Sequence, residues 1–251
     1  MAEKRYFTKI ELLLTFFSLL IIFTLLLPVV SNAKVLGMKE SCAANLKKSV
    51  TAMKMYAGDF EGMIPVYQKF PDIAGSKDPA VRRNLYSWAG AMYQYSYLPQ
   101  ADPAARCPQM GSKMIVDTRS KFYKYSSYGT LTSNKQFFKP YRRNQIRNFG
   151  KRNEYRFVMT GKLVSPETFP LLVDTVDKAN REYWAFSTDA ADNYGMHSRH
   201  ENSVQAAFAD GSVKALLPED FREHCRKSGL YGDPAKKYGY FDMTGSKTEM
   251  K

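Results

Sequence analysis

The first hydrophobic feature of the chain is an uninterrupted apolar segment near its N-terminus. Residues 12–30 read LLLTFFSLLIIFTLLLPVV, which is 19 residues without a charged side chain. As a helix this segment would be about 28 Å long, close to the hydrocarbon thickness of a bilayer. Lys4, Arg5 and Lys9 precede it, so the positive-inside rule predicts a single membrane span with a cytoplasmic N-terminus.

A cleaved signal peptide is the alternative interpretation. Ser31 and Ala33 are small residues at the −3 and −1 positions of a cleavage site after Ala33, and a basic region precedes the apolar one. The apolar segment is, however, longer than the roughly 7–15 residues of a usual signal-peptide core. This length favours an anchor that stays on the protein.

After Pro28, which is expected to kink or locally melt the helix, apolar residues recur every three to four positions with lysines between them. This period predicts an amphipathic helix with one face in a protein core. The glycines and proline that follow predict its end near Gly58 or Gly62, before Pro65.

The remaining pattern predicts an α+β head on an antiparallel sheet. Residues 203–217 alternate between apolar and polar positions on both sides of Asp210-Gly211, a strong signal for a β-hairpin turn. Residues 171–173 form a short apolar run that predicts a central strand. Residues 88–98 fit either a short helix or a strand, and glycines and prolines predict a loop over residues 58–84.

We therefore expect a long N-terminal helix packed on the sheet of a single head. The predicted parts are a leader-like segment (1–11), a transmembrane half-helix (12–30), an amphipathic half-helix (31–57), a globular head (58–228) and a polar, poorly ordered tail (229–251).

Composition narrows the class of protein. Hydrophobic residues make up 44% of the 251 residues and charged residues 24%, which excludes wholesale disorder. The mean hydropathy of −0.42 excludes a polytopic membrane protein. The formal net charge of +13 makes an anionic surface or polymer a reasonable partner.

Three short motifs occur in order along the chain. The first is FTKIELLL at residues 7–14, followed by LLLP at residues 25–28. The second is SCAANLKK at residues 41–48. The third is His200 followed by nine residues and then Asp210-Gly211. Together they resemble type IV pilins and type II secretion pseudopilins, in the branch that has large heads with an H-x9-DG "processing-associated" motif.

The resemblance implies a non-catalytic subunit that assembles through its N-terminal helix into a filament or pseudopilus. It implies an assembly role for Glu11, whose carboxylate would pair with a cation of a neighbouring subunit. It also implies cleavage by prepilin peptidase between a glycine and Phe7, which leaves a methylatable amine. Tyr6 replaces that glycine and Lys9 an apolar residue, so Tyr6 and Phe7 are candidate processing residues in an altered site.

The residue types of the H-x9-DG motif also allow an interpretation that does not use the resemblance. Asp210 and Gly211 are first of all turn residues, and His200 is expected to fix a loop by a side-chain hydrogen bond. His197 and His200 lie near Asp189, Asp192 and Asp210 in the sequence, residue types that can bind zinc or calcium. The loop is not recognisably helical, and we predict no metal and no cofactor.

The chain contains three cysteines, and the predicted topology places them in an oxidising compartment. A disulfide between Cys42 and Cys107 is the preferred pairing among three, and it would leave Cys225 as a free thiol. If Cys42 is reduced, it is a small apolar residue of the helix.

One segment concentrates the positive charge. Residues 139–156 contain seven basic residues and one acidic residue, with aromatic residues between them. The basic residues are Lys139, Arg142, Arg143, Arg147, Lys151, Arg152 and Arg156. The pattern is typical either of a groove for an acidic polymer or of a solvated insertion, and the second interpretation is favoured.

The expected function is that of a pilin-like subunit in a bacterial inner membrane, with its head in the periplasm or outside the cell. Its partners would be copies of itself or other pilin-like subunits, the membrane, and prepilin peptidase. No motif for catalysis or a small-molecule substrate occurs. The alternative is a membrane-tethered or secreted basic protein that binds an acidic polymer and does not polymerise.

Overall fold

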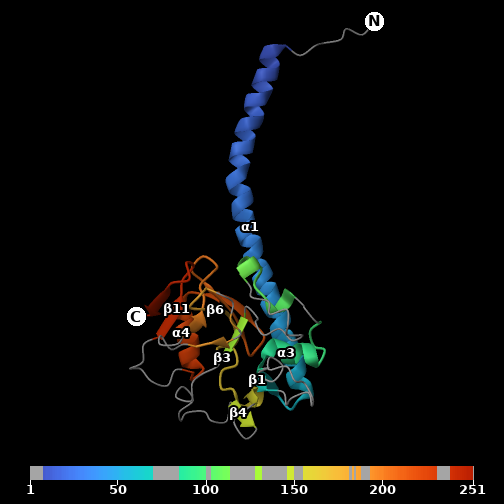
Figure 1. Cartoon of the computed structure of the whole chain (residues 1–251), viewed down its shortest axis with the longest axis vertical. Coiled ribbons are helices and arrows are strands. Elements are labelled where there is room, and N and C mark those ends of the chain that lie inside the picture. Colours follow the sequence, from blue (N-terminus) through green and yellow to red (C-terminus); the bar gives the residue numbers. More distant parts are fainter. Residues whose placement is uncertain are drawn as a thin grey trace, which may run out of the picture. The chain divides into compact units, whose positions relative to one another are not determined.

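The computed structural model describes most of the chain as two compact units. The described residues are 8–69, 85–99, 103–113, 128–131, 146–149, 155–180, 183, 185–187, 193–230 and 238–250. The first unit ends at Glu40 and the second begins at Ser41. Together they form an α+β protein with a long N-terminal apolar helix and antiparallel and mixed sheets (Figure 1).

Helix α1 (Lys9–Asp59) contributes residues to both units. Its 51 residues include Pro28 and are assigned as one continuous helix, so the predicted local melting at this proline does not occur. By length and composition, its apolar part could cross a membrane, and none of that part is buried. The helix ends beside Gly58, as the sequence predicted.

The amphipathic pattern of the second half of α1 is confirmed. Cys42, Leu46, Val50 and Met53 are fully buried and belong to one core cluster that also contains residues of the sheets. Leu36, which continues the same period toward the N-terminus, is 56% exposed. The core-facing part of the helix therefore begins near Cys42.

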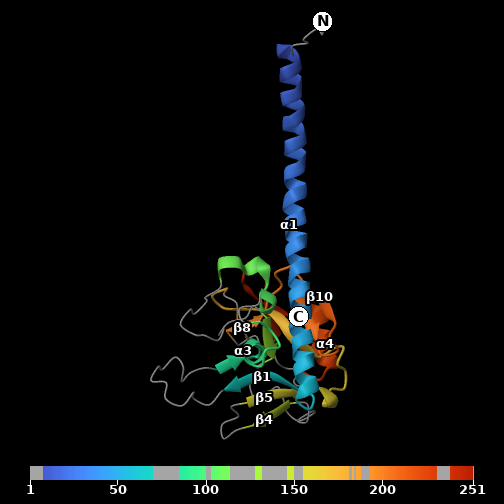
Figure 2. The same ribbon diagram turned by 90° about the vertical axis from the view of Figure 1, so that its right-hand side faces the viewer.

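The described residues of the second unit form three sheets, and Figure 2 shows strands of the two larger sheets beside the part of α1 that belongs to this unit. The largest has the order β10-β9-β6-β3-β7, and β8 also pairs with β6. Its strands are β3 (Tyr128–Leu131), β6 (Pro170–Asp177), β7 (Ala185–Phe186), β8 (Tyr194–Met196), β9 (Val204–Phe208) and β10 (Val213–Leu216). The predicted strand at residues 171–173 is the centre of this sheet, and β9 and β10 are the predicted hairpin. The pair β3 and β7 is parallel, which corrects the prediction of an entirely antiparallel sheet.

The second sheet has the order β2-β1-β5-β4. Its strands are β1 (Met63–Lys69), β2 (Leu85–Ser87), β4 (Ile146–Phe149) and β5 (Tyr155–Met159). Strand β1 corrects the prediction of a loop from residue 58 onward. Pro65 misled that prediction, because proline removes a backbone donor, and the strand accommodates it at an irregularity in its register with β5.

Two further elements were predicted wrongly or left open. The expected disordered tail contains the hairpin of β11 (Tyr238–Phe241) and β12 (Lys247–Met250), and Phe241 is buried. Of the two alternatives for residues 88–98, a helix is present. Beyond α1, the helical elements within the described residues are α3 (Trp88–Gln94), η1 (Pro103–Ala105), η2 (Pro108–Lys113), η3 (Thr160–Lys162) and α4 (Pro218–Lys227).

Gly129 occupies the closest approach between strands in the large sheet. A Cβ atom at this position would lie 2.5 Å from Thr175 Cγ2 and 2.6 Å from the Ala185 carbonyl carbon. Backbone on the β7 side cannot move without disturbing the parallel pair. We predict that Gly129→Ala lowers the free energy of unfolding by at least about 3 kcal/mol, because overpacking and backbone displacement add.

The measurement is urea unfolding of the full chain in mild detergent, followed by tryptophan fluorescence. Gly161→Ala is the matched control, because a Cβ atom there meets nothing within 4 Å; it should change stability by less than about 0.5 kcal/mol. Equal midpoints for the two variants would show that β3 is not confined as described.

Candidate functional site

The N-terminal unit carries the predicted assembly residue. Glu11 Oε2 accepts hydrogen bonds from Thr8 N at 2.8 Å and Thr8 Oγ1 at 2.9 Å, and Glu11 N donates to Thr8 Oγ1 at 3.2 Å. This reciprocal arrangement is a capping box, which satisfies backbone donors at the start of a helix. The signal in the sequence is Thr-x-x-Glu, and it was overlooked. Tyr6 and Phe7 lie outside the described residues.

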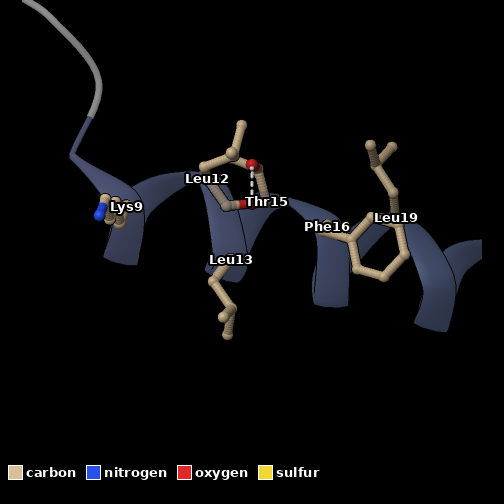
Figure 3. A pocket seen from close by; sticks show the side chains of 6 residues that line it. All are labelled: Lys9, Leu12, Leu13, Thr15, Phe16 and Leu19. Atoms are coloured by element: carbon tan, nitrogen blue, oxygen red, sulfur yellow. Dashed lines mark hydrogen bonds between the residues drawn. The ribbon is translucent and has the colours of Figure 1, made fainter.

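From Leu12 to Leu27, the side chains on the helix surface are apolar except for those of Thr15, Ser18 and Thr24. Figure 3 shows the side chains around an open depression on this surface, lined by Lys9, Leu12, Leu13, Thr15, Phe16 and Leu19. The hydroxyl of Thr15 donates to the carbonyl oxygen of Leu12 at 2.8 Å. The lining is thus mostly apolar, and the Lys9 amine and the Thr15 hydroxyl are its polar groups.

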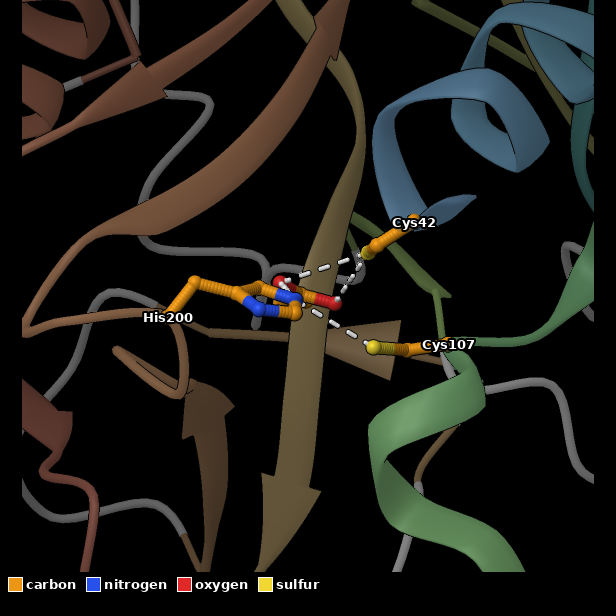
Figure 4. Close-up of side chains that lie close together, drawn as sticks. Cys42, Cys107 and His200 are labelled. Carbon is orange, nitrogen blue, oxygen red and sulfur yellow. Dashed lines mark hydrogen bonds and ion pairs between the residues drawn. The ribbon is translucent and has the colours of Figure 1, made fainter. Parts of the chain in front are cut away.

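In the second unit, four residues far apart in the sequence converge. Figure 4 shows Cys42, Cys107 and His200 pointing toward one another from three different segments, and Asp174 of β6 completes the group. One ligand atom from each residue lies within 4.8 Å of the others, and all four residues are buried. We call these four residues the Cys/Asp/His cluster.

The distances within the cluster are short. Cys107 Sγ lies 3.3 Å from His200 Nε2, which lies 3.6 Å from Asp174 Oδ2. Cys42 Sγ lies 3.7 Å from Asp174 Oδ1. The cysteines predicted to pair are therefore neighbours, but no disulfide joins Cys42 and Cys107 in this structure.

Burial perturbs the acidic groups of the cluster. Loss of solvation raises the pKa of Asp174 to about 7, although the nearby Arg199 acts in the opposite direction. Burial also raises the pKa of the Cys42 thiol, while the interaction with Cys42 lowers the pKa of the Cys107 thiol. Cys107 is thus the thiol that holds negative charge more easily.

Neighbouring backbone contacts hold the cluster in place. Asn45 Nδ2 donates to the carbonyl oxygen of Arg106, next to Cys107, at 2.9 Å. Gln109 Nε2 donates to the carbonyl oxygen of Arg199, next to His200, at 3.1 Å. Tyr128 Oη donates to the carbonyl oxygens of Cys42 and Arg106, at 3.0 Å each. The segments that carry the two cysteines and the histidine are therefore fixed to one another.

The other residues that the sequence analysis selected as site candidates lie outside the Cys/Asp/His cluster or outside the described residues. His197 is buried, and loss of solvation lowers its pKa to about 3, so it is a neutral core residue outside the cluster. Asp189 and Asp192 lie outside the described residues. In the basic segment, only the backbones of Arg147 in β4 and Arg156 in β5 are described. The remaining members, Lys139, Arg142, Arg143, Lys151 and Arg152, lie outside the described residues.

Asp210 and Gly211 are turn residues, as predicted. Gly211 has φ +93°, which favours glycine, and Asp210 Oδ1 accepts a hydrogen bond from Ser212 N at 2.8 Å. The turn also contacts α1, because Lys47 Nζ donates to Gly211 O at 2.6 Å and Lys54 Nζ to Asp210 O at 2.8 Å. The two ends of the H-x9-DG motif thus lie beside different parts of α1. His200 lies near Cys42, and the Asp210-Gly211 turn contacts Lys47 and Lys54.

No protein-family model, curated protein or solved structure matches this chain.

Lys47 offers a test of the contact between α1 and the turn. Lys47→Met keeps the length and helix propensity of the side chain but removes the charged donor to Gly211. We expect the free energy of unfolding to fall by about 1–2 kcal/mol, the usual contribution of a partly buried hydrogen bond from a charged group.

Lys48→Met is the matched control, because Lys48 is likewise exposed on the same helix and its side chain makes no hydrogen bond to the described residues. Urea unfolding of both variants in detergent measures the difference. An equal loss of stability in both, or in neither, would contradict a specific contribution of the Lys47 contact.

Proposed function

We propose that this chain is a membrane-anchored, pilin-like or pseudopilin-like subunit that assembles through α1 into a filament or secretion pseudopilus. The observation that supports the proposal is the character of this helix. Its N-terminal part exposes large apolar side chains, while its C-terminal part is buried in the core of the second unit.

The exposed apolar surface is too extensive for a helix in water. Ile10 is 72% exposed, Leu19 65% and Leu27 56%. Contiguous apolar surface of this kind marks contact with a membrane or with other proteins. In this proposal, lipid covers the apolar surface of the unassembled subunit, and the helices of other copies cover it in the assembled filament.

Polar groups within the apolar segment need no external partner. The hydroxyls of Thr15, Ser18 and Thr24 each donate to a backbone carbonyl oxygen of the same helix at 2.8 Å. Apolar burial provides little attraction between helices inside a bilayer, so association depends on close packing and on polar pairing. Glu11 is the acidic residue of the first helical turn, and we assign that pairing to it.

The capping box permits a sharp test of this role. Glu11→Gln keeps a side chain that can complete a capping box but removes the negative charge. Thr8→Ala removes the cap and keeps the charge. We predict that Glu11→Gln weakens self-association in detergent micelles by about 1 kcal/mol, or roughly fivefold, and that Thr8→Ala leaves it unchanged.

Sedimentation of the full chain at several protein-to-detergent ratios gives the association constant. Equal weakening by both substitutions would show that Glu11 acts only as a cap. A wild-type chain that stays a single copy at every ratio would overturn assembly, and would favour the tethered binding protein for an acidic polymer.

A further inference from the structure

The spacing of the Cys/Asp/His cluster is close to the spacing of ligand atoms around one tetrahedral metal ion. With Zn–S bonds of about 2.3 Å and Zn–N or Zn–O bonds of about 2.0–2.1 Å, neighbouring ligand atoms lie roughly 3.3–3.8 Å apart. Measured through one carboxylate oxygen, Asp174 Oδ2, the successive distances from Cys107 Sγ to His200 Nε2, to Oδ2 and to Cys42 Sγ are 3.3, 3.6 and 3.9 Å, and all four ligand atoms lie within 4.8 Å of one another. Two thiolates, an imidazole and a carboxylate are also a donor set that suits zinc.

The geometry at His200 distinguishes coordination from a catalytic relay. In a relay, one ring nitrogen faces the nucleophile and the other faces the carboxylate. Here Cys107 and Asp174 both approach Nε2, and Nδ1 has no hydrogen-bond partner among the described residues. Donor atoms that converge on one side of a ring surround a point, as ligands of a metal do.

The charge balance agrees with a divalent ion. With both cysteines bound to a metal as thiolates and Asp174 as a carboxylate, the group carries three negative charges in a buried volume, where unpaired charge is strongly unfavourable. Arg199 supplies one positive charge, with Nε 3.6 Å from Asp174 Oδ1 and a side chain only 2% exposed. A divalent cation supplies the other two, which makes the group neutral.

We propose that Cys42, Cys107, Asp174 and His200 form a structural zinc site in the second unit. Four protein ligands fill a tetrahedral shell, and such closed sites stabilise folds rather than bind substrates. The ion would join α1, the turn between η1 and η2, the central strand β6 and the segment before β9. This site does not depend on assembly through the N-terminal part of α1.

The contacts around the cluster support this arrangement. The bonds from Asn45, Gln109 and Tyr128 hold the backbone next to three of the four ligands. Metal sites depend on such outer contacts, which orient the ligands. The motif SCAANLKK thus supplies one ligand, Cys42, and one orienting residue, Asn45, to the same site.

Cobalt(II) titration of the metal-free full chain in mild detergent tests the proposal without a substitution. The chain is treated with a chelator under reducing conditions and then titrated with Co²⁺ alone. We expect saturation at about one equivalent per chain, with a thiolate-to-cobalt charge-transfer band and the intense visible bands of tetrahedral coordination. Zn²⁺ should then displace the cobalt and raise the unfolding temperature.

Matched variants identify the ligands. Cys107→Ser and His200→Gln should each reduce the bound metal at least about tenfold. Cys225→Ser and His224→Gln carry the same changes outside the cluster and should bind as wild type does. Because the wild-type titration needs no variant, poor folding of a ligand variant cannot hide the answer.

Three results would overturn the site. They are a wild-type chain that takes up no Co²⁺ or Zn²⁺, cobalt spectra without a thiolate band, and a native protein in which Cys42 and Cys107 are joined by a disulfide. Retention of full metal binding by Cys107→Ser would overturn the ligand assignment in the same way.

Discussion

The structure depends on one constraint, which is that a single helix meets two different environments. The N-terminal part of α1 exposes apolar side chains that water cannot solvate favourably. From Cys42 onward, the same helix buries one face in the core of the second unit. A helix tolerates both environments because it satisfies its backbone hydrogen bonds internally. Residues of the sheets pack in one core with the face that α1 buries.

The contacts with α1 give a structural reason for the H-x9-DG and SCAANLKK motifs. Strand β9 connects His200, in the cluster with Cys42, to the turn whose carbonyl oxygens accept hydrogen bonds from Lys47 and Lys54. Nine intervening residues are the length of chain needed for one short strand and its flanking turns. The two ends of the motif therefore both lie beside α1, His200 near Cys42 and the turn near Lys47 and Lys54.

The sequence predicted those elements whose structure depends on neighbouring residues in the chain. The apolar run of α1, the central strand β6 and the Asp210-Gly211 hairpin all follow from period and turn chemistry. Strand β1 was missed because Pro65 argues against a strand unless its register irregularity is known. Asp174 was missed because it lies in an apolar strand, and the acidic residues chosen instead were simply near His200 in sequence. Only the tertiary fold brings Asp174 and Cys107 to that histidine.

The account rests on α1 remaining part of the mature protein, since both the anchoring and the proposed assembly need residues 12–30. The most direct measurement is the intact mass of the protein purified from its native membrane. A chain that begins at Met1, Ala2 or Phe7 agrees with the account and also states whether cleavage occurs after Tyr6. A chain that begins at Lys34 would contradict it, because the apolar half of the helix would have been removed.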